Sequence, residues 1–131
     1  MAVTFHHEPD RRRLLVTISP GTRWTAFEAA IMKALADQPA IADWNLIIDD
    51  QGPTEDVTVD GMVRMGEAFR RLARQPERDT FTVVVTADRF FASWAQVIDA
   101  NYGRRKHHAA PTVEAAGRLL DRLEAGAGGP R

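Results

Sequence analysis

The sequence predicts an α/β fold, with a mixed, mostly parallel five-stranded sheet and four helices mainly on one face. Short apolar runs alternate with segments of helical period in the order ββαβαβαβα, which is typical of parallel strands joined by right-handed crossovers. A length of 131 residues suits one domain. We therefore expect a single domain over residues 1–125 and a flexible tail over residues 126–131.

The first elements are a hairpin and a helix. Apolar runs at residues 3–7 and 14–18 are separated by a Pro-Asp pair that favours a turn, so the first strand is expected to be antiparallel to the others. Thr25 and Glu28 have the spacing of a capping box at the start of the first helix, which Pro39 ends.

The other strands and helices then alternate along the chain. Thr58, Asp88 and Thr112 each precede a helical segment, and the first and last of them are predicted caps. Gly61 and Gly66 lie within the second helix, where close packing would explain them. The predicted strands are residues 44–48, 81–86 and 105–109, of which the last is polar enough for a sheet edge.

Alternate side chains of the three inner strands differ in polarity. One set is apolar and includes Val16, Ile48 and Val83. The other set mixes polar and apolar residues, which predicts a second sheet face that the helices leave half-exposed. An apolar patch ringed by threonines on that face is a candidate homodimer or partner surface, unless the chain termini cover it. The candidate interface residues are Leu15, Thr17, Ile47, Thr82 and Val84.

Composition excludes several classes of protein. The net charge of -1 lacks the basic excess of a nucleic-acid-binding protein, so the basic clusters at residues 11–13, 70–71 and 104–106 are interpreted as solvated charge. The absence of cysteine excludes thiol catalysis. No apolar run approaches the roughly 20 residues that span a bilayer, and no signal peptide is recognisable, so we expect a cytoplasmic protein.

The arrangement resembles the SpoIIAA-like fold of STAS domains, and is most similar to stand-alone bacterial STAS-like proteins. Residues 44–49, 82–88 and 108–116 carry this resemblance, which is one of layout over nearly the whole chain. It implies a regulatory module that works through protein–protein contact. Anti-sigma antagonists of the family have a phosphorylated serine after the central strand. Asp50 occupies that place here, which puts phosphorylation control in doubt and suggests a fixed negative charge.

Polar side chains also gather where the predicted parallel strands end. Ligands of open α/β sheets bind at this edge. A polar binding loop or an acidic Mg²⁺ site is therefore an alternative to simple capping of strand ends and helix starts, which we favour. The candidate residues are Asp49, Asp50, Gln51, Gly52, Thr58, Thr86 and Asp88.

The histidines form two adjacent pairs, His6-His7 and His107-His108, which are interpreted as exposed edge-strand residues. Neighbours on a strand point to opposite faces, so a metal site would need one histidine from each pair. The sequence contains no recognisable catalytic motif. We predict a non-enzymatic interaction module without cofactors. The alternatives are a carrier that binds a small apolar ligand or lipid between helices and sheet, and an enzyme that uses the acidic edge.

Overall fold

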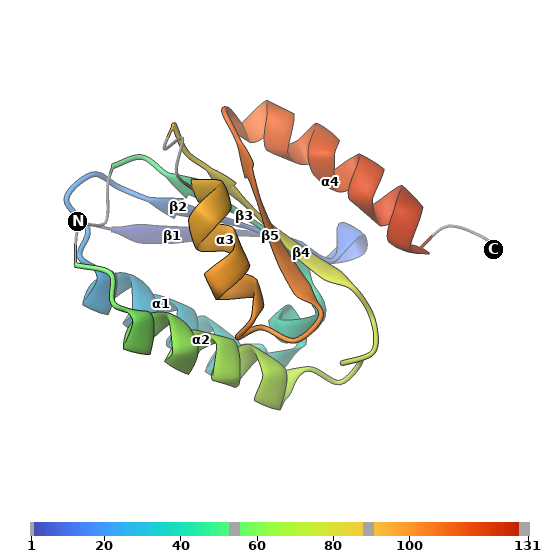
Figure 1. Ribbon diagram of the computed structural model, residues 1–131, viewed down its shortest axis with the longest axis horizontal. Helices are drawn as coiled ribbons and strands as arrows, with labels where there is room; N and C mark the ends of the chain where they lie inside the picture. Colours follow the sequence, from blue (N-terminus) through green and yellow to red (C-terminus); the bar gives the residue numbers. More distant parts are fainter. Residues whose placement is uncertain (1, 53–55, 88–90, 129–131) are drawn as a thin grey trace.

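The computed structural model describes residues 2–52, 56–87 and 91–128, and its elements follow the predicted order (Figure 1). The strands are β1 (Val3–Glu8), β2 (Arg13–Ile18), β3 (Asn45–Asp50), β4 (Thr80–Val85) and β5 (Arg105–Ala110). The α-helices are α1 (Trp24–Asp37), α2 (Val59–Leu72), α3 (Phe91–Asp99) and α4 (Val113–Gly128), and short 3-10 helices span Pro9–Arg11 and Pro39–Asp43.

The five strands form one sheet in which spatial order equals chain order, β1-β2-β3-β4-β5. The β1–β2 pair is antiparallel and every other pair is parallel, as predicted. The polar strand β5 lies at one edge of the sheet and β1 at the other. Consecutive right-handed crossovers in one direction place their helices on the same face.

Helices cover both faces of the sheet, and α4 is separated from the other three (Figure 1). Helices α1 and α2 pack against Leu14 and Leu46, and α3 lies beside them at the β5 edge. Helix α4 packs on the opposite face, where Ile47, Val83 and Leu120 belong to a second apolar cluster. Three helices therefore share one face as expected, whereas the second face is not left open.

The predicted alignment of alternate side chains across the inner strands is wrong for β4. Leu46 pairs with Thr82 and Ile47 pairs with Val83, and paired residues of neighbouring strands point to the same face. Both faces of β4 are covered, so all its side chains except half-buried Val84 are buried and polarity does not distinguish the two sets. The candidate interface residues therefore divide between the α4 face (Leu15, Thr17 and Ile47) and the α1–α2 face (Thr82 and Val84).

The caps of α2 and α4 are confirmed. The Thr58 hydroxyl accepts a hydrogen bond from the Gly61 amide at 3.0 Å, and the Thr112 hydroxyl accepts one from the Ala115 amide at 3.0 Å. Helix α4 continues to Gly128, so the predicted tail does not begin at residue 126, and residues 129–131 lie outside the described part of the chain.

The capping box predicted for the first helix is wrong. Helix α1 begins at Trp24, whose amide donates to Asp56 at 2.7 Å. A carboxylate from the segment before α2 thus takes the role expected of Thr25. Glu28 instead accepts a hydrogen bond from the Trp24 indole at 2.8 Å, which fixes the first turn of the helix.

Gly66 permits close contact between α2 and the end of α3. A side-chain carbon at Gly66 would overlap the carbonyl group of Asn101 and press on the Tyr102 ring. The close packing expected at this glycine is therefore confirmed. Gly103 follows at φ 64°, the left-handed conformation predicted for it.

Alanine at two helical glycines should shift stability in opposite directions. Gly66→Ala should lower the free energy of unfolding by about 1–3 kcal/mol, because the Asn101 backbone cannot move away cheaply. Gly117→Ala is the matched control, since a methyl group there meets open space in α4 and should stabilise the helix by up to about 1 kcal/mol. Urea unfolding followed by circular dichroism measures both. A Gly66→Ala protein as stable as the wild type would contradict this packing.

Candidate functional site

The residues predicted to form a loop at the carboxyl ends of the strands make mainly local contacts. Gln51 donates to Asp49 at 3.3 Å, and the Gly52 amide donates to Asp50 at 3.4 Å. Burial, together with the Asp49 carboxylate, raises the pKa of Asp50. Thr58 caps α2, as described above.

Thr86 lies further along the same edge, directly after β4. The Thr86 amide donates to the Ala110 carbonyl at 3.1 Å, which extends the β4–β5 pairing by one step. Asp88 lies outside the described residues. Within the described ranges, no three His, Asp or Glu side chains are grouped to hold a metal ion. The polar-loop interpretation of this edge stays a prediction.

The two histidine pairs lie on opposite edges of the sheet, so one metal cannot bind a histidine from each. His107 is not an exposed edge residue: its side chain is 7% exposed and packs against the Tyr102 ring. The Asp99 carboxylate at the end of α3 accepts from the His107 amide at 2.8 Å and lies 2.9 Å from its Nδ1. Burial lowers the pKa of His107 to about 4 and outweighs the opposing effect of Asp99, so the ring is neutral at pH 7.

Two adjacent cavities open at the other edge of the sheet, at the amino ends of the parallel strands. Their volumes are about 150 and 160 Å³, and they share Asp43, Arg78 and Thr80 as lining residues. We call the two cavities together the amino-end site. Six arginines line it: Arg11, Arg12, Arg70, Arg78, Arg104 and Arg105. Three acidic residues line it as well: Asp43, Asp79 and Glu124.

The topology explains why arginines distant in sequence meet there. The clusters at residues 11–13 and 104–106 lie at the beginnings of parallel strands, and residues 70–71 lie in the last turn of α2, which returns the chain to the same edge. Basic side chains in that turn also offset the negative end of the helix dipole. The interpretation of these clusters as solvated charge is wrong for Arg13 and Arg105, which are buried.

Arg105 forms the buried floor of the amino-end site, and neutral groups hold its guanidinium. Its guanidinium donates to the carbonyls of Trp44 at 2.6 Å and Ala42 at 3.2 Å. It also donates to the Thr82 hydroxyl at 3.0 Å and lies 4.7 Å from the centre of the Phe69 ring. Burial lowers the pKa of Arg105 to about 10, so the group stays charged at neutral pH. Its positive charge has no carboxylate in hydrogen-bond contact among the described residues.

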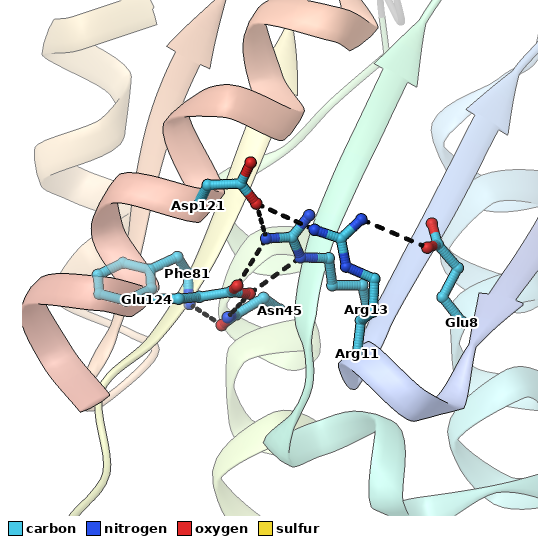
Figure 2. Close-up of polar contacts among 7 residues, drawn as sticks. All are labelled: Glu8, Arg11, Arg13, Asn45, Phe81, Asp121 and Glu124. Atoms are coloured by element: carbon cyan, nitrogen blue, oxygen red, sulfur yellow. Dashed lines mark hydrogen bonds and ion pairs between the residues drawn. The ribbon is translucent and has the colours of Figure 1, made fainter. Parts of the chain in front are cut away.

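Arg13, by contrast, is neutralised by α4 (Figure 2). It donates to Glu124 at 2.6 and 3.0 Å and to Asp121 at 2.6 Å. Asn45 donates to Glu124 at 2.7 Å and accepts from the Phe81 amide at 2.8 Å. This cluster joins α4 to three neighbouring strands, and Glu124 forms one wall of the amino-end site.

Three arginines of the amino-end site have no acidic partner among the described residues: Arg12, Arg70 and Arg78. Arg104 pairs with Asp79 at 2.5 Å and Arg11 pairs with Asp121 at 3.1 Å, so those two charges are balanced. Asp43 is engaged by the backbone amides of Arg74 and Gln75. The site therefore presents exposed, unbalanced positive charge, and the sequence signal for it was that each basic cluster adjoins an element end at this edge.

No family model, curated protein or solved structure matches this chain. The resemblance to STAS domains accordingly stays a prediction. Of the helices that the structure describes, none is long and apolar enough to cross a membrane.

The burial of His107 predicts a loss of stability in acid. Its pKa is lower in the folded than in the unfolded protein, so the stabilisation is complete above about pH 6.5 and is lost as pH falls toward 4. Between pH 7 and pH 4.5 this histidine should account for a loss on the order of 2 kcal/mol in the free energy of unfolding. His107→Gln should flatten that part of the pH profile in urea unfolding, whereas His6→Gln, at an exposed site on β1, should leave it unchanged. Equal profiles for wild type and His107→Gln would contradict this assignment.

Proposed function

We propose that the protein is a non-enzymatic binding module that acts through contact with a protein partner, and that an acidic segment of the partner docks on the amino-end site. The observation that carries this proposal is a group of three guanidinium groups that have no carboxylate partner among the described residues: those of exposed Arg70 and Arg78 and of half-buried Arg12. Complementary charge at an interface steers association and selects partners.

The concentration of charge supports an acidic partner. Six of the chain's 17 basic residues line two adjacent cavities, although the protein as a whole has a net charge of -1. Buried Arg105 adds positive charge from below, in a medium of low dielectric constant where charges act more strongly. Asp79 and Glu124 interrupt the basic surface, which suits a short acidic segment better than a continuous nucleic-acid backbone.

The dimensions of the site support side chains as occupants. Each cavity has a volume of about 150 Å³, whereas pockets for drug-sized ligands are typically about 300–1,000 Å³. One cavity has apolar walls from Phe69, Ala73 and Tyr102 next to its arginines. An acidic segment with one apolar or aromatic side chain would satisfy both features.

A carrier of a small apolar ligand is the second candidate, favoured by those apolar walls. A cavity of about 150 Å³ accommodates a benzene-sized group but not a lipid chain. Native mass spectrometry of protein purified from cells distinguishes the two functions, because a carrier should retain a bound small molecule.

A homodimer through the predicted mixed face is a further form of protein contact. Helix α4 covers part of that face and Ile47 is only 9% exposed, so the area open to a second copy is reduced to the β1–β2 side. Light scattering at several protein concentrations tests this prediction, and a monomeric mass at high concentration would contradict it.

Neutralising the unpaired arginines should weaken binding of an acidic probe. We expect a fluorescein-labelled deca-glutamate peptide to bind in 50 mM salt, and the triple variant R12Q/R70Q/R78Q to bind it at least tenfold more weakly in fluorescence anisotropy. The matched control is R71Q/R118Q/R122Q, which removes the same charge from exposed arginines that do not line the amino-end site. Binding should also weaken as salt rises, because exposed charges are screened.

Two results would contradict the proposal. One is equal weakening by the two triple variants, since binding would then follow net charge alone. The other is an absence of peptide binding by the wild-type protein at low salt.

A further inference from the structure

Two of the unpaired arginines converge on one neutral atom. Arg12 follows the Pro9–Arg11 turn and Arg78 lies in the α2–β4 segment, yet each donates from a terminal nitrogen to the same side-chain oxygen of Gln75 at 3.4 Å. The two guanidinium nitrogens thus lie within twice that distance of each other. Like charges repel at such a separation, and a single amide oxygen compensates them weakly. An anion at this point would replace that repulsion with two charge-assisted contacts.

The backbone of Arg12 provides an independent observation. Arg12 has φ 54° and ψ 50° and is the described non-glycine residue with positive φ. Glycine or asparagine adopts this left-handed conformation at lower cost. The Arg12 amide donates to Pro9 at 3.1 Å and its carbonyl accepts from the Asn45 amide at 3.0 Å, so the conformation is fixed. Strained positions gather at functional sites, and here the strain is tolerated with a long cationic side chain rather than with glycine.

The backbone of Gln75 and Arg78, which meet Arg12 from the α2–β4 segment, is equally fixed. The Gln75 amide donates to the buried Asp43 carboxylate at 3.0 Å, and the adjacent Arg74 amide donates to the same carboxylate at 3.0 Å. The Arg78 amide donates to the Gln75 carbonyl at 3.0 Å and closes a turn. Gln75 and Arg78 therefore project from a braced segment, and the loss of backbone freedom on binding is small.

We propose that Arg12, Arg78 and Gln75 form a site for a phosphate monoester dianion, carried on the acidic segment of the protein partner. This inference rests on the proposed function and narrows it. Two guanidinium groups match the two charges of a phosphate monoester, and each presents several N–H donors to its oxygens. A half-turn of the Gln75 amide would exchange its oxygen for its NH₂ group, which adds a neutral donor. A single carboxylate has one charge and would leave one arginine unbalanced.

The test compares two short peptides that differ in one side chain. The first is acetyl-Glu-Glu-phosphoserine-Glu-Glu-amide, and the second has glutamate in place of phosphoserine. We expect the phosphopeptide to bind the wild-type protein at least tenfold more tightly, by isothermal titration. Nuclear magnetic resonance should show a selective shift of the Gln75 side-chain NH₂ signals on addition of the phosphopeptide.

Three variants assign the preference to this site. R12Q/R78Q should bind the two peptides equally, and R118Q/R122Q, with the same net charge, should keep the tenfold difference. Arg12→Gly should lose the preference with a Tm no lower than that of the wild type, because glycine fits the left-handed backbone. A preference that survives in R12Q/R78Q would overturn the site assignment.

The remaining outcomes separate this inference from the proposed function. Equal binding of the two peptides to wild-type protein, with loss of both in the R12Q/R70Q/R78Q triple variant, would overturn the phosphate site and leave acidic docking intact. Inorganic phosphate that binds as tightly as the phosphopeptide would overturn the assignment to a partner. Failure of both peptides to bind would overturn both proposals.

Discussion

The arrangement of the amino-end edge depends on one buried cation, Arg105. Its guanidinium donates to carbonyls just before β3, to β4 through Phe81 and Thr82, and stacks on Phe69 of α2. A buried charge without a carboxylate is costly unless its donors are satisfied, and here neutral oxygens satisfy them. Loop segments that would otherwise move separately are thereby tied to one group. The consequence is a rigid floor whose positive charge has no carboxylate in hydrogen-bond contact among the described residues.

Two neighbouring arginines near this floor have different roles: one stabilises the fold and the other is available for binding. Arg13 is covered by α4 and fully paired, so its charge contributes to the structure. Arg12, its neighbour in sequence, has a left-handed backbone and donates to the Gln75 side-chain oxygen, which Arg78 also contacts. Two adjacent residues of one type thus differ in environment, because Arg13 begins β2 whereas Arg12 precedes that strand in a left-handed conformation. Proteins commonly retain such locally unfavourable arrangements where a ligand provides the compensation.

Local chemistry was sufficient to predict much of the fold from the sequence, but not the site. The caps at Thr58 and Thr112, the left-handed Gly103 and the order of elements all depend on residues close together in the chain. The side-chain alignment predicted for β4 was wrong because threonine is typical of a solvent-facing position. Thr82 is instead buried, and its hydroxyl accepts a hydrogen bond from Arg105. The site was missed because Arg12 and Gln75 are 63 residues apart, and only the sheet order brings them together.

The agreement between strand order and chain order has a consequence for synthesis. Each strand that leaves the ribosome can add directly to the edge of the one before it, so the sheet can grow without waiting for a distant partner. Helix α4 is the exception, because it follows all five strands in the chain and covers the second face. Until it emerges, the nascent chain exposes Ile47 and Val83 to water and leaves the Arg13 guanidinium without counter-charge. This apolar surface is therefore removed from water only when α4 packs on the sheet.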